Sequence, residues 1–120
     1  MTSCSALETL IASTADICRK PFHHAVLSAD DATPDDYCGR IECRDGDGQR
    51  LVELDLELEL YRSGMDLNLT LAWVDQPARP ILWHGQHPVW MDGETGQRCS
   101  APADGAPLEA LARRLRALLV

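Results

Sequence analysis

The chain has 120 residues, with 19 acidic and 11 basic side chains and a net charge of −8. This length is typical of one domain around a single core, so residues 1–120 are treated as one domain. The negative charge argues against nucleic-acid binding, because neutralising phosphates requires a clustered basic surface. It favours a basic protein partner instead. No apolar run approaches the roughly 20 residues that a membrane span requires.

The amino-terminal residues lack the basic start and apolar run of a secretory signal. Five cysteines without a Cys-x-x-Cys pair favour reduced thiols over a disulfide framework or a zinc site. Ten of the basic residues are Arg and one is Lys, a bias typical of GC-rich bacterial genomes. Together these features predict a cytoplasmic bacterial protein that folds without a cofactor.

A first helix is predicted over residues 6–19. Ser5 and Glu8 form a capping box, in which each side chain can bond the other residue's backbone N–H. Apolar residues, Ile17 among them, recur at three- and four-residue spacing, and Pro21 supplies the stop. We expect this helix to bury its apolar face against the rest of the chain.

A short strand is expected over 22–27, followed by an acidic loop over 28–36. From Tyr37 the sequence indicates an antiparallel meander with strands over 37–44, 51–61 and 66–75. Asp45-Gly-Asp-Gly and Ser63-Gly64 supply the turns between these three strands.

Residues Val52–Tyr61 alternate apolar and acidic side chains. Successive strand side chains point to opposite faces, so Val52 and four leucines are predicted to enter the core. If Tyr61 faces Asp66, Leu54 lies opposite Trp73 and the core faces stay in phase. On the other face Arg40 is expected to lie opposite Glu53. That face then carries an acidic stripe: Glu53, Asp55, Glu57 and Glu59.

Two shorter strands are predicted over 81–84 and 89–92, with a last short strand over 97–100. A closing helix begins near Pro107 and carries one apolar face, including Leu111 and Leu118. The predicted fold class is α+β, with an antiparallel β-meander of about four to six strands packed on one face by the N-terminal and C-terminal helices.

The acidic stripe is the first candidate site, because alternating carboxylates on a flat sheet face can receive an Arg- or Lys-rich partner. The alternative is an ordinary solvent face, since like charges roughly 7 Å apart are well screened. The arginines of the last helix could also cover part of this face.

The second candidate is the segment from Trp83 to Cys99. Trp83 and Trp90 could form a hairpin tip for recognition, since Trp is enriched at interface hot spots, or both rings could pack on the core. Alternatively, His84 and His87 could bind a metal with Asp92 or Cys99, or His84 could activate Cys99 as a nucleophile. This would make the protein a small metal-binding or Cys/His enzyme.

No calcium site is expected at Asp45-Gly-Asp47-Gly, because Gln49 and Leu56 occupy ligand positions of a calcium loop. The chain also lacks a Gly-rich phosphate loop and a Gly-x-Ser-x-Gly elbow. We therefore expect a protein-binding or regulatory module without a metal or a catalytic site. A homodimer through an uncovered sheet face or the last helix is compatible with this fold. The predicted partner-binding residues are Glu53, Asp55, Glu57, Glu59, Trp83, His84, His87 and Trp90.

Overall fold

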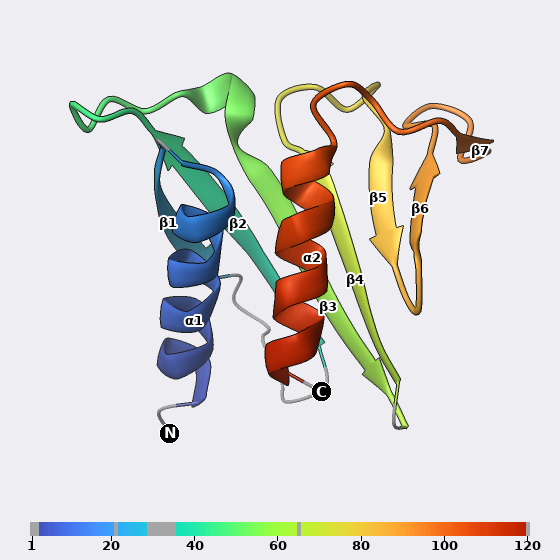
Figure 1. Cartoon of the computed structure of the whole chain (residues 1–120), viewed down its shortest axis with the longest axis horizontal. Coiled ribbons are helices and arrows are strands. Elements are labelled where there is room, and N and C mark those ends of the chain that lie inside the picture. Colours follow the sequence, from blue (N-terminus) through green and yellow to red (C-terminus); the bar gives the residue numbers. More distant parts are fainter. Residues whose placement is uncertain (1–2, 21, 29–35, 65, 120) are drawn as a thin grey trace.

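The structure is a computed structural model that describes residues 3–20, 22–28, 36–64 and 66–119. Figure 1 shows the arrangement of its elements. In chain order they are α1 (Ser3–Cys18), β1 (His23–Ser28), β2 (Asp36–Arg44), the 3₁₀ helix η1 (Val52–Leu54), β3 (Leu56–Ser63), β4 (Asp66–Trp73), β5 (Ile81–His84), β6 (Pro88–Met91), β7 (Arg98–Cys99) and α2 (Ala106–Leu119).

The seven strands form one sheet in the order β1-β2-β3-β4-β5-β6-β7, and each neighbouring pair is antiparallel. Every strand therefore pairs with the strand next to it in sequence. This confirms the predicted α+β meander, with more strands than the expected four to six. The difference arises at the ends of the sheet, where β1 and the two-residue β7 both pair with neighbours.

Both helices lie on the same face of the sheet, side by side (Figure 1). α1 packs over β1, and α2 packs over β4 and β5. The leucine face of the meander and the apolar faces of the helices form the core between them. Its buried residues are Ile11, Ala15, Tyr37, Ile41, Leu56, Leu58, Leu60, Leu69, Leu71, Trp73, Leu82, Trp90, Leu108, Leu111, Ala112 and Leu115.

The long predicted strand over 51–61 is interrupted. Residues Val52–Leu54 form η1, and β3 begins only at Leu56. Because alternation holds only in extended backbone, Val52 is exposed and Asp55 is buried, the reverse of the prediction. The Asp55 carboxylate accepts a hydrogen bond from the backbone N–H of Cys43 at 2.9 Å. It also pairs with the Arg50 guanidinium at 2.5 Å.

The register of β3 against β4 differs from the prediction by two residues. Ser63 faces Asp66, so Leu56 rather than Leu54 lies opposite Trp73. Gly64 adopts a positive φ of 63° in the turn, a conformation that costs glycine little. A shift of two residues keeps every side chain on its predicted face. In the β2–β3 pair the shift is four residues, and Arg40 lies opposite Glu57 instead of Glu53.

The helix ends also differ from the prediction. α1 already begins at Ser3, so Ser5 lies inside the helix and does not cap it. Ile17 and Leu118 are exposed although both were placed on apolar faces. α2 begins at Ala106 and packs on the leucine face, so its arginines do not cover the acidic stripe. The predicted acidic loop lies largely outside the described residues.

Candidate functional site

The face of the sheet opposite the helices carries the candidate site, and we call it the bare face. One cross-strand row on this face runs from Cys38 through Glu59, Thr70 and Trp83 to Val89. Thr70 lies directly opposite both Glu59 on β3 and Trp83 on β5. Since neighbouring strands are about 4.8 Å apart, the backbones at Glu59 and Trp83 lie roughly 10 Å apart. The acidic and aromatic residues predicted as separate contact surfaces thus belong to one surface.

The bare face changes in character from β2 to β6. Towards β2 it carries Arg40, Glu57 and Ala72 in a second row, and Asp36, Tyr61 and Asn68 in a third. Towards β6 it carries Ile81 and Met91, which face each other. Tyr61 is 52% exposed and Trp83 is 38% exposed. An acidic area therefore adjoins an apolar and aromatic one, and neither of the two described helices lies over them (Figure 1).

Glu57 and Glu59 are exposed, and no ion pair among the described residues includes either of them. The negative charges of both residues act on the neighbouring Cys38 thiol. Burial raises the pKa of Cys38, and the two carboxylates raise it further. A thiol held protonated in this way is a poor nucleophile. This part of the bare face therefore presents two exposed carboxylates beside a protonated thiol.

Glu57 also lines a hollow of about 320 Å³ at one end of the bare face. Ala72 and Ile81 form its floor, and the β4–β5 loop from Gln76 to Arg79 supplies part of its wall. Arg79 is engaged elsewhere, because its guanidinium stacks on the Trp73 ring at 3.6 Å and pairs with Asp104. No ion pair among the described residues includes Glu57, although Arg40 lies directly opposite it on the same face.

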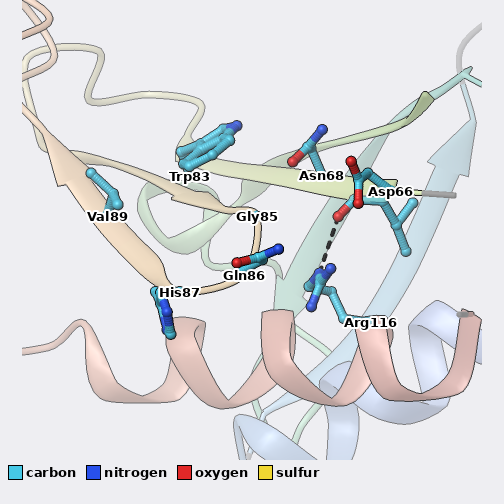
Figure 2. A pocket seen from close by; sticks show the side chains of 9 residues that line it. Asp66, Asn68, Trp83, Gly85, Gln86, His87, Val89 and Arg116 are labelled. Atoms are coloured by element: carbon cyan, nitrogen blue, oxygen red, sulfur yellow. Dashed lines mark hydrogen bonds between the residues drawn. The ribbon is translucent and has the colours of Figure 1, made fainter. Parts of the chain in front are cut away.

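A second hollow of about 360 Å³ lies beside Trp83 (Figure 2). It forms because β5 pairs only with Leu69–Leu71, so the start of β4 projects beyond the β5–β6 hairpin. Arg116 reaches into the gap from α2, and its Nε donates to the carbonyl oxygen of Leu67 at 3.0 Å. Gly85 allows the Trp83 ring to lie close, since a Cβ at this position would meet that ring at 2.7 Å.

Trp90 belongs to the core and not to the bare face. Its ring stacks on Trp73 with centroids 6.3 Å apart, and its indole N–H donates to the Glu109 carboxylate at 2.7 Å. Trp90 alternates with Val89 and Met91 along β6, so it points to the helix side of the sheet. Of the two alternatives for these tryptophans, packing on the core holds for Trp90 and exposure holds for Trp83. Trp90 is therefore not exposed for the partner contact predicted for it.

His84, His87 and Cys99 do not converge. His84 is buried on β5 and faces Pro88, whereas Cys99 faces Trp90. Strand spacings place the backbones of His84 and Cys99 roughly 12 Å apart. His84 and His87 do share a hollow, but Arg113 and Arg116 line it too, and two guanidinium groups repel a metal cation. No group of three metal-ligating side chains occurs among the described residues.

The other two acidic residues of the predicted stripe, Glu53 and Asp55, do not lie on the bare face. Glu53 is exposed on η1, outside the cross-strand rows, and Asp55 is buried in its bonds to Cys43 and Arg50. Tyr61 was missed by the sequence reasoning, although it follows Glu57 and Glu59 in the same alternating phase. Val89 likewise shares its face with Trp83, which sequence alone could show only if the hairpin register were known.

Comparison with known proteins found no match among curated proteins and none among solved structures. No described helix has both the length and the apolar character needed to cross a membrane. One family does match, and the match covers residues 8–118, which include the whole sheet and most of both helices. The chain therefore belongs to the family described as a domain of unknown function, DUF8659.

Proposed function

We propose that this protein is a cytoplasmic protein-binding module whose bare face recognises a basic segment of a partner protein. The observation that carries the proposal is the cross-strand row in which Glu59 and Trp83 flank Thr70. Carboxylates next to an exposed aromatic ring suit a partner segment that has both Lys or Arg and apolar side chains. Aromatic residues at the centre of an interface commonly carry much of the binding energy.

The surroundings of these residues support the same assignment. A cationic side chain of the partner would enter the hollow beside Glu57, where no ion pair among the described residues competes for the carboxylate. Apolar side chains of the partner would cover Trp83, Val89 and Met91. The overall charge of −8 would attract such a partner at long range.

The test is affinity capture from the source organism at low salt, with stepwise salt elution and mass spectrometry. A partner retained by the wild type should be lost from the double variant Glu57→Gln, Glu59→Gln and from Trp83→Ala. The expected loss for Trp83→Ala is at least about thirtyfold in affinity of the purified pair. Moderate salt should release the partner, because exposed charges are screened within about 8 Å at physiological ionic strength.

The matched control is the double variant Asp47→Asn, Glu94→Gln. It also removes two negative charges, from exposed turn positions outside the cross-strand rows of the bare face. This control should retain the partner, and all variants should keep the circular dichroism spectrum of the wild type. If the control loses the partner to the same extent, binding depends on net charge alone, which would contradict a specific site on the bare face. If the only protein captured is a second copy of this chain, the bare face mediates self-association and the basic partner is contradicted.

A further inference from the structure

On the helix side of the sheet, Arg19 is a buried cation whose hydrogen bonds are incomplete. Its backbone N–H closes the last turn of α1 by donating to Ala15 at 2.9 Å, and the residue is only 7% exposed. The guanidinium Nη2 donates to the carbonyl oxygen of Leu54 at 3.1 Å. Its Nη1 is buried and has no hydrogen-bond partner in the described part of the chain. Buried guanidinium groups without an acceptor are rare in folded proteins.

The charge of Arg19 also lacks a counter-ion among the described residues. None of the ion pairs among the described residues includes it. The two nearest carboxylates are already engaged, Asp55 by Arg50 and Asp104 by Arg79. Burial lowers the pKa of Arg19. Cys43, Asp55 and Asp104 act in the opposite direction but do not cancel the effect of burial. An arginine side chain nevertheless stays charged at neutral pH.

Arg19 lines a pocket of about 170 Å³ where the end of α1, η1 and the start of α2 meet. The pocket walls are apolar on several sides and come from Phe22, Leu54, Trp73 and Leu108. Lys20 adds a second cation. Asp104 also lines the pocket, and its negative charge is already paired with Arg79.

We infer that this pocket binds a small carboxylate with an apolar body, held by the Arg19 guanidinium. A carboxylate held against Arg19 would supply a counter-ion for the buried charge. Because less than 1 Å² of Nη1 is accessible, the guanidinium must turn slightly toward the pocket before Nη1 can donate to that carboxylate. The apolar body would replace water against Phe22, Trp73 and Leu108. Since a water occupies about 30 Å³ in the liquid, the pocket holds roughly six non-hydrogen atoms, the size of butyrate.

Other ligand classes fit less well. A metal cation would be repelled by Arg19 and Lys20. A phosphate group would bring more oxygens than this mainly apolar wall can satisfy, and unsatisfied oxygens lose affinity. Trp73 lines both this pocket and the hollow beside Glu57. Glu57, Glu59 and Trp83 do not line the pocket, so variants of those residues test the proposed partner without changing the pocket's lining.

The test is a titration of isotope-labelled protein with isobutyrate and with isobutyramide, its neutral analogue of equal size. The indole resonance of Trp73 reports on the pocket, and that of Trp83 on the bare face serves as internal reference. A ligand of this size is expected to bind in roughly the millimolar range. Isobutyrate should shift the Trp73 resonance saturably, isobutyramide should bind at least tenfold more weakly, and Trp83 should not move.

Variants then assign the recognition to Arg19. Arg19→Met keeps the length of the side chain and removes its charge, so the Trp73 shift should be lost. Arg113→Met removes an exposed arginine of α2 that does not line this pocket, and binding should be unchanged. The comparison of acid with amide on the wild-type chain remains decisive if Arg19→Met does not fold. Equal shifts with acid and amide, no saturation up to about 50 mM, or full binding by folded Arg19→Met would overturn the inference.

Discussion

Asp55 shows at the scale of one residue how a regular pattern can mislead. It occupies an acidic position of an alternating segment, yet its side chain is only 1% exposed. The backbone N–H groups of Leu54 and Asp55 bond back to Leu51 and Val52, which turns the chain into η1. The carboxylate then reaches the N–H of Cys43 and the Arg50 guanidinium. Asp55 thus fastens the β2–β3 connection to the end of β2.

Replacing Asp55 by Asn should therefore destabilise the fold. The substitution removes the charge that Arg50 and the Cys43 N–H both contact, so we expect a loss of about 2–4 kcal/mol in the free energy of unfolding. Urea denaturation measures it. Asp47→Asn is the control, because Asp47 is exposed in the same connection and should change stability by no more than about 0.5 kcal/mol. Similar values for the two variants would contradict a structural role for Asp55.

His24 makes the stability depend on pH. Its side chain is fully buried, and its Nδ1 lies 2.9 Å from the Asp16 carboxylate. Burial lowers the pKa of His24 below its ordinary 6.5, and Arg19 and His23 lower it further, although Asp16 opposes the shift. The unfolded chain therefore binds a proton at higher pH than the folded chain does. Stability is complete above about pH 6.5 and falls as the pH drops below that value.

The variant His24→Asn tests this linkage. Asn can still donate a hydrogen bond to Asp16 but does not titrate. Between pH 7.5 and about 5, the unfolding free energy of the wild type should fall more steeply than that of His24→Asn. His23→Asn, at the exposed neighbouring position, should retain the steep dependence. Parallel profiles for wild type and His24→Asn would show that another group carries the effect.

At the scale of elements, α2 is held by one narrow face. Leu108, Leu111, Ala112 and Leu115 are buried, and Trp90 adds a hydrogen bond to Glu109. Leu118 continues the apolar spacing but is 55% exposed. The spacing of leucines shows that a helix has an apolar face. How much of that face is buried depends on how far the sheet extends beneath the helix.

The two leucines Leu111 and Leu118 provide a matched pair of variants on α2. Leu111→Ala should cost about 2–5 kcal/mol of unfolding free energy, because it leaves a cavity in the closed core. Leu118→Ala should change stability by no more than about 0.5 kcal/mol. Thermal or urea unfolding of the two variants measures the difference. A comparable cost at Leu118 would mean that this part of α2 is covered in solution, for example by a second copy.

At the scale of the whole molecule, the placement of both helices on one face determines the candidate site. The leucine face of the meander packs against the helices in the core. Glu57, Glu59 and Trp83 lie on the opposite face, which neither described helix covers. The register of consecutive strands brings residues from β2 to β6 into one row. The proposed partner surface and the Arg19 pocket can be tested with separate variants, because Glu57, Glu59 and Trp83 do not line that pocket.

Local sequence determined the fold class, the two helices and the core phase of β3 and β4, because apolar periodicity is a short-range property that survives a two-residue shift in register. Tertiary structure alone decided that Asp55 and Trp90 are buried, that His84 and Cys99 lie apart, and that Glu59 and Trp83 share a row. Each of these depends on where a strand breaks or which residue it faces. Backbone hydrogen bonds and packing between distant segments set those features, and no local pattern encodes them.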